Sequence, residues 1–125
     1  MKKVIAAPKA PAPKGAYSQG VVAAAPQLYV SAQGPIDPET GAVVGETFAG
    51  QLERALLNVQ AVVEAAGATL ADVVKVTVFL ADWSYFPEMD EIYGRFFPQP
   101  YPARTPVKMD IPMGLVMVDA VVALP

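Results

Sequence analysis

Apolar residues recur at helical spacing along one long stretch of the chain, residues 47–66. They lie three or four positions apart, which gathers them on one face of a helix: Phe48, Leu52, Leu56, Val59 and Val63. Gly67 follows in the position that often ends a helix. The pattern predicts a helix from Thr47 to Ala66 that buries this face and turns polar residues such as Gln51 and Asn58 to solvent.

A second apolar stripe predicts a shorter helix that ends at about Phe97. The stripe consists of Phe86, Met89, Tyr93 and Phe96 or Phe97. Ser84 precedes it and is a residue type that caps helix N-termini well, so we place the start of the helix there. A stripe at this spacing packs in a core more often than it forms a ligand site, and we interpret it as core.

Alternating and β-branched runs predict five strands. They are a short strand beginning in KKVI and the runs at about 27–33, 71–82, 104–110 and 115–124. Asp37 to Gly41 has the composition of a turn, with Pro38 at its second position. The resulting order, β-β-α-β-α-β-β, predicts an α+β domain with its helices on one face of the sheet.

Length and composition indicate a single domain, residues 1–125, with apolar surface to spare. A chain of 125 residues is long enough for one hydrophobic core and short for two. Hydrophobic residues make up 54% of it and charged residues 17%, which leaves more apolar surface than one core needs. The simplest way to remove that surface from water is to bury it between identical subunits.

The residue types present limit the chemistry. The chain has no cysteine and no histidine, which excludes thiol nucleophiles, disulfides, histidine acid–base catalysis and the usual zinc or haem ligands. Its formal net charge of −3 argues against nucleic acid as a partner. Early prolines interrupt any signal-peptide pattern, and no apolar run approaches the length of a membrane span. We therefore expect a cytoplasmic protein without membrane contact.

Two charged residues stand out towards the C-terminus. Asp119 lies in the apolar run LVMVDAVVAL and shares one strand face with Met117 and Val121, so its carboxylate needs a partner. Arg104 begins the preceding predicted strand, and a short turn would run that strand antiparallel to the one with Asp119. Two interpretations are open. Spacing favours a structural Arg104–Asp119 salt bridge; the other is a free Arg104 that binds an anion while Asp119 handles a proton or a water nearby.

Five segments, in order over nearly the whole chain, form a recognisable set. They are GAYSQG at 15–20, LYVSAQGPIDPETG at 28–41, NVQAVVEAAGATLADVVKVTVFLAD at 58–82, FPEMDEIYGRFF at 86–97 and YPAR at 101–104. Each motif alone is weak, and the ordered set is specific. Together they resemble the RidA (YjgF) family of reactive-intermediate deaminases.

The resemblance implies a fold, an assembly and a reaction. It implies a chorismate-mutase-like α+β fold, a mixed sheet with two helices on one face, assembled as a homotrimer with ligand sites in clefts between subunits. Members of the family hydrolyse enamine and imine acids such as 2-aminoacrylate and 2-iminopropanoate to 2-keto acids and ammonia. They use no metal and no organic cofactor, which is compatible with a chain that lacks histidine and cysteine.

The resemblance also assigns roles to individual residues. Arg104 falls on the family's carboxylate-binding arginine, and Asp119 on the acid that holds or activates the attacking water. Tyr17 closes the apolar side of the pocket. The other positions assigned to substrate binding are Ser31, Gly34, Asp90, Thr105 and Pro106. Tyr17 and Ser31 are not distinctive enough to be chosen without the resemblance.

Three of these positions differ from the usual residues of the family. Asp119 replaces a glutamate and is one methylene shorter, and Asp90 stands where asparagine is common. Pro106 has no backbone N–H at a position expected to donate one to the ligand. The leading hypothesis is therefore an imine deaminase. The alternatives are a family trimer that binds small carboxylates without this reaction and, least favoured by the acidic composition, an RNA-directed activity.

Overall fold

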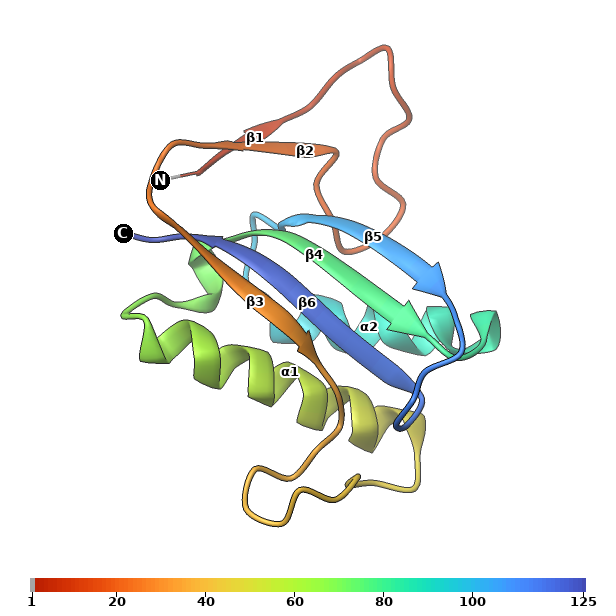
Figure 1. The fold of residues 1–125 in the computed structure, drawn as a ribbon. Helices are drawn as coiled ribbons and strands as arrows, with labels where there is room; N and C mark the ends of the chain where they lie inside the picture. The colour runs from red at the N-terminus through yellow and green to blue at the C-terminus, as the bar shows by residue number, and fades with distance from the viewer. Residues whose placement is uncertain (1) are drawn as a thin grey trace.

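The computed structural model describes residues 2–125 and shows a four-stranded mixed sheet with two helices packed on one face (Figure 1). The strands are β3 (Gln27–Gln33), β4 (Val73–Leu80), β5 (Ala103–Lys108) and β6 (Val116–Ala123), in the spatial order β3-β6-β4-β5. β4 and β5 are parallel, and the other two pairings are antiparallel. The helices are α1 (Phe48–Ala65) and α2 (Phe86–Phe96). The predicted α+β fold is confirmed.

The N-terminal segment forms a separate ribbon and then returns to the main sheet. β1 (Lys2–Ile5) and β2 (Gly20–Ala23) pair with each other in antiparallel register. Between them the chain makes a long loop whose end lies beside β5, where Ser18 bridges Ala103 (Figure 1). The sequence predicted one strand here and missed β2, because four residues that follow a proline- and glycine-rich segment carry little periodic signal.

The two faces of the main sheet differ in character. Along β4 and β6, buried valines such as Val76 and Val118 alternate with partly exposed residues. The buried set packs in one core with the apolar face of α1 and with Met89 and Tyr93 of α2. The opposite face carries no helix (Figure 1). Within residues 2–125, no helix has the length and apolarity that a membrane crossing requires.

Helix α1 follows its sequence pattern closely. All five apolar positions of the predicted face are buried. Thr47 caps the N-terminus by accepting a hydrogen bond from the Gly50 N–H at 3.1 Å, and Gly67 follows the helix with a φ of 81°, a conformation that favours glycine. The solvated position predicted for Gln51 was wrong: it is 7% exposed, donates to the Gly45 carbonyl and accepts from the Leu115 N–H.

Helix α2 begins later than predicted. Ser84 does not cap it; instead Asp82 accepts a hydrogen bond from the Ser84 N–H and starts a short 3₁₀ turn, Trp83–Tyr85. α2 then begins at Phe86, with Pro87 in its first turn. A proline is well suited to this place because the N–H groups of a first helical turn have no partner within the helix. The prediction failed because Asp82 and Ser84 are both residue types that cap helices, and the sequence does not show which of the two accepts the hydrogen bond.

The last two strands are not neighbours in the sheet. The sequence suggested strands running antiparallel across a short turn, and they do run in opposite directions, but β4 lies between β5 and β6. β5 is therefore an edge strand. An edge tolerates Pro106, whose nitrogen cannot donate to a neighbouring strand.

Candidate functional site

The predicted site residues fall into two groups on opposite faces of the sheet. Arg104 of β5 lies opposite Val76, a core residue, so its side chain is on the face covered by the helices. Asp119 of β6 lies opposite Thr77, the next residue of β4, so its side chain is on the uncovered face. The predicted Arg104–Asp119 salt bridge is therefore wrong, because a strand separates the two residues and their side chains point to opposite sides.

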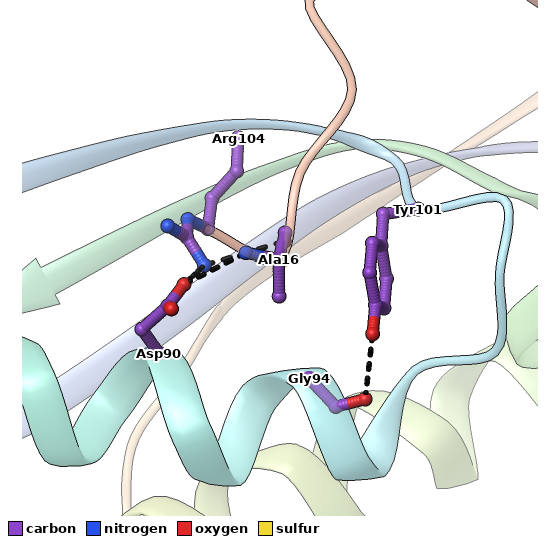
Figure 2. A network of polar contacts seen from close by, with 5 residues as sticks. All are labelled: Ala16, Asp90, Gly94, Tyr101 and Arg104. Carbon is purple, nitrogen blue, oxygen red and sulfur yellow. Dashed lines mark hydrogen bonds and ion pairs between the residues drawn. The ribbon is translucent and has the colours of Figure 1, made fainter. Parts of the chain in front are cut away.

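Arg104 instead pairs with Asp90, which projects from α2 (Figure 2). Arg104 Nη1 donates to Asp90 Oδ1 at 2.8 Å and to the Ala16 carbonyl at 3.3 Å. Asp90 Oδ1 also accepts from the Ala16 N–H at 2.9 Å. The ion pair thus joins three distant parts of the chain: the N-terminal segment, α2 and β5.

Three aromatic rings surround the guanidinium of Arg104. Its Cζ lies 4.9 Å from the ring centroid of Tyr93, 5.2 Å from that of Tyr17 and 5.7 Å from that of Phe86. Within this cage Arg104 Nε is buried and has no hydrogen-bond partner among residues 2–125. Aromatic faces stabilise a cation without using its N–H groups, so the arginine keeps donor capacity for an anion.

Tyr93 is held neutral in this cage. Its side chain is fully buried, and its hydroxyl has no hydrogen-bond partner in the described part of the chain. Burial raises the pKa of the Tyr93 hydroxyl far above its ordinary value, the Arg104 cation opposes that rise, and the Asp90 carboxylate adds to it. Tyr93 therefore contributes an uncharged face to the arginine.

The N-terminal segment is fastened to this region by backbone contacts. The Ser18 N–H donates to the Pro102 carbonyl at 3.0 Å, and the Ser18 hydroxyl donates to the Tyr101 carbonyl. The Tyr101 hydroxyl in turn donates to the Gly94 carbonyl of α2 at 3.1 Å (Figure 2). These contacts fix Tyr17 beside Arg104, and its role as a pocket wall stays a prediction.

A hollow of about 520 Å³ is lined by Tyr17 and by residues of the N-terminal loop. Its walls are mostly small apolar residues between Val4 and Pro13, together with Ser18 and Gln19. Gln19 holds the loop over it through contacts with the backbone of Ala7 and Pro11. Neither Arg104 nor Asp119 lines this hollow, so we do not place the reaction there.

The second group forms a polar row across the uncovered face of the sheet. Thr77 of β4 lies between Asp119 of β6 and Thr105 of β5. A bulge in β3 sets Ser31 and Ala32 together opposite Asp119, because Val30 pairs with Ala120 and Gln33 with Val118. Three predicted residues, Ser31, Thr105 and Asp119, therefore share one row.

Lys75 joins this row although the sequence did not single it out. Its Nζ donates to the Thr105 hydroxyl at 2.8 Å, and Asp119 Oδ1 accepts from the Thr77 N–H at 3.2 Å. Partial burial lowers the pKa of the Lys75 ammonium, and the nearby Asp119 carboxylate opposes that shift. The only signal in the sequence was a lysine alternating with valines in a strand.

The remaining predicted positions lie at the margins of these groups. Gly34 follows β3, and its carbonyl accepts from the Asn58 side chain at 3.1 Å. Pro106 lies opposite Val78 on the helix-covered side of β5, two residues beyond Arg104. Sequence reasoning assigned Phe86 and Tyr93 to the core and missed their contact with Arg104. Residues 2–125 contain no cluster of three or more acidic side chains that could hold a metal ion.

Comparison with known proteins places the chain among relatives of similar length. Residues 7–118 match the family model described as "Endoribonuclease L-PSP". A protein named "2-iminobutanoate/2-iminopropanoate deaminase" from Salmonella typhimurium is 42% identical over 112 residues, covering 87% of this chain and 86% of the relative. A protein of the same name from Dermatophagoides farinae is 38% identical over 106 residues, covering 85% of this chain and 82% of the relative.

The likeness extends to solved structures. The crystal structure of RidA from an Antarctic Psychrobacter species matches with a TM-score of 0.76 at 38% identity. The match covers 98% of this chain and 99% of that one. Sequence and fold therefore agree over nearly the full length.

Proposed function

The chain belongs to the RidA/YjgF/L-PSP (RutC) family, and on that premise we propose that it hydrolyses reactive 2-imino acids, with their 2-enamine tautomers, to 2-keto acids and ammonia. The substrate class is that of 2-iminopropanoate and 2-aminoacrylate, and the reaction uses no cofactor. The observation that carries the proposal is Arg104, a caged arginine with donor capacity beside Tyr17.

In this proposal Arg104 binds the substrate carboxylate. Nη1 is already engaged by Asp90 and Ala16, whereas Nε has no partner among the described residues. A small movement of the surrounding side chains would present the Nε side of the planar guanidinium to two carboxylate oxygens. Tyr17 would pack against the short apolar side chain of the substrate.

The chemistry then requires one water and a sequence of proton transfers. Water attacks C2 of the protonated imine, a C–O bond forms, and the C=N π electrons move to nitrogen. Asp119 accepts a proton from the water and returns it to the nitrogen. The C–N bond then breaks as an oxygen lone pair forms the C=O bond, ammonia leaves, and Asp119 passes the hydroxyl proton to that ammonia. The products are the 2-keto acid and ammonium, so atoms and charge balance.

Because Arg104 and Asp119 of one chain lie on opposite sheet faces, a single chain does not bring these two roles together. We therefore place the site between subunits of a homotrimer of chorismate-mutase-like type, with Arg104 from one subunit and Asp119 of the partner subunit. Such an assembly would bury the uncovered face of the sheet. That face carries Met117, Val121 and Tyr29, and Tyr29 is 71% exposed in the single chain.

The test is release of keto acid from an imine made in situ by an amino-acid oxidase. The wild-type chain should accelerate release over the uncatalysed rate, and Arg104→Ala should abolish the acceleration. Arg95→Ala is the matched control, since Arg95 lies on α2 in an exposed pair with Glu91 and its loss removes the same charge. A wild-type rate equal to the uncatalysed rate would defeat the proposal.

A second candidate is a carboxylate-binding trimer without this reaction. Pro106 offers no N–H to a ligand beside Arg104, and Asp119 is one methylene shorter than the usual glutamate, which shortens its reach by about 1.5 Å. This candidate predicts that calorimetry detects 2-keto acid binding that depends on Arg104 while imine hydrolysis stays at background. It fails if no such binding is found.

An RNA-directed activity is suggested by the description of the matching family model and by the names given to similar solved structures, such as a "putative endoribonuclease" from Thermotoga maritima. The net charge of −3 disfavours it, because sequence-independent RNA binding depends on a basic surface. Salt-sensitive binding of single-stranded RNA would revive it.

A further inference from the structure

Asp90 places a negative charge directly against the arginine that we propose to bind carboxylates. Oδ1 of Asp90 takes both of the hydrogen bonds that Asp90 accepts within residues 2–125, one from Ala16 and one from Arg104 (Figure 2). The Arg104 side chain is 1% exposed and that of Asp90 is 28% exposed. The pair is therefore shielded on the arginine side and accessible on the aspartate side, where Oδ2 remains available.

This pairing changes which ligands the site favours. Arg104 and Asp90 together carry no net charge, so a ligand with a single negative charge gains the attraction of Arg104 and meets the repulsion of Asp90. A ligand that carries a carboxylate and an adjacent positive charge can face both groups favourably. At reduced dielectric a second charge a few ångströms away alters affinity severalfold or more.

We infer that Asp90 makes the Arg104 site select zwitterions that carry a carboxylate and a positively charged nitrogen on C2, such as the protonated form of a 2-imino acid. Monoanionic 2-keto acids are disfavoured. The carboxylate binds Arg104, and the charged nitrogen of the same ligand binds Asp90 Oδ2. This inference rests on the proposed function and names the charge state of its substrate. Its consequence is discrimination against product, because hydrolysis removes the positive charge and leaves a keto acid that Asp90 repels.

A purely structural role for Asp90 is the competing explanation. Asp90 holds Ala16, and a Cβ on Gly15 would lie 2.6 Å from Asp90 Oδ1, so the N-terminal segment packs closely on this carboxylate. Asp90→Asn separates the two roles. Asparagine keeps an oxygen that accepts from Ala16 and Arg104 in the same shape, removes the charge, and replaces Oδ2 by an amide NH2 donor.

The experiment measures two ligands with the same carbon skeleton by calorimetry. 2-Oxobutanoate is a monoanion, and L-2-aminobutanoate is a zwitterion. We expect Asp90→Asn to bind 2-oxobutanoate about tenfold more tightly than the wild type, which corresponds to about 1.4 kcal/mol. We expect its affinity for L-2-aminobutanoate to fall. The melting temperature of each protein reports whether the segment around Ala16 is retained.

Glu91→Gln is the matched control, because Glu91 is the next residue on α2 and its exposed carboxylate pairs with Arg95 rather than Arg104. The inference is overturned if Asp90→Asn leaves 2-oxobutanoate affinity unchanged, if Glu91→Gln tightens it equally, or if both ligands gain affinity by the same factor. Imine turnover by the wild type is followed in parallel. Imine turnover without the change in 2-oxobutanoate affinity defeats this inference alone. The change in affinity without imine turnover defeats the proposed function alone.

Discussion

At the residue scale, the surroundings of Arg104 explain both its position and its availability. Tyr17, Phe86 and Tyr93 supply aromatic faces, and Asp90 supplies a counter-charge, so a nearly buried guanidinium is tolerated. The sequence could propose Arg104 through the YPAR motif. It could not identify its partner, because Asp90 is fourteen positions earlier and only the packing of α2 against β5 brings the two together.

Gly15 tests how tightly the N-terminal segment packs on Asp90. An added Cβ would lie 2.6 Å from Asp90 Oδ1, a distance that forces the carboxylate to move. Gly15→Ala should therefore lower the free energy of unfolding by about 1–3 kcal/mol in denaturant titrations. Gly20→Ala is the control, since its Cβ would meet only Ile5 at 3.9 Å, and should change stability by less than about 0.5 kcal/mol. Equal effects would show that Asp90 is not held in place.

Tyr93 gives a pH-dependent test of the same cage. Burial raises the pKa of its hydroxyl, so the folded chain keeps a proton that the unfolded chain releases near pH 10. The stability linked to this proton is present below about pH 10 and is lost as pH rises towards the folded pKa. Tyr93→Phe should show a shallower loss of stability in alkaline denaturant titrations, whereas Tyr29→Phe, at a site 71% exposed, should follow the wild type. Identical slopes for all three would contradict the shielding of Tyr93.

At the element scale, periodicity predicted the helices and strands that have one buried face. α1 and β3 were predicted within a residue or so of their bounds. In α1 the buried positions repeat with the helical period, and in β3 the partly buried Leu28 and the buried Val30 lie two positions apart. Errors arose where local chemistry was ambiguous, as at Asp82 and Ser84, or where a strand was too short to show a period, as in β2. The neighbours of each strand in the sheet could not be predicted from the sequence, because strand order depends on packing.

Helix α1 offers a direct comparison of adjacent leucines. Leu56 is fully buried in the core, and Leu57 is 36% exposed. Leu56→Ala should lower the free energy of unfolding by about 2–5 kcal/mol through lost burial and the cavity that remains. Leu57→Ala should cost less than about 1 kcal/mol. A larger effect at Leu57 would mean that this face of α1 is covered in the assembled protein.

The 3₁₀ turn that precedes α2 allows a test of Asp82 as its cap. Asp82 accepts from the Ser84 N–H, and that backbone hydrogen bond is the main cause that lowers the pKa of the Asp82 carboxyl. Its contribution to stability is present above the ordinary carboxyl pKa and is lost as pH falls through the lowered value. At neutral pH, Asp82→Ala should lower the melting temperature more than Ser84→Ala does. The reverse order would restore Ser84 as the cap.

At the scale of the whole molecule, the predicted site residues occupy two faces of one sheet. Lys75, Thr105 and Asp119 lie on the uncovered face, while Tyr17, Asp90 and Arg104 lie on the helix-covered side. The high content of hydrophobic residues had indicated that identical subunits assemble. Under the proposed function, the division of the site is a physical reason to expect assembly, because the chemistry needs both groups at one substrate.

The central claim, a deaminase site shared between subunits, is tested most directly by mixing two inactive chains. Arg104→Ala and Asp119→Ala chains, each expressed alone, should release keto acid from an imine at the uncatalysed rate. Co-expressed in equal amounts, they should recover about a quarter of wild-type activity, because random assembly joins an intact Arg104 to an intact Asp119 of the partner subunit at about one interface in four. If both residues of a site came from one chain, every site would carry a defect. A mixture no more active than its parents would contradict the account.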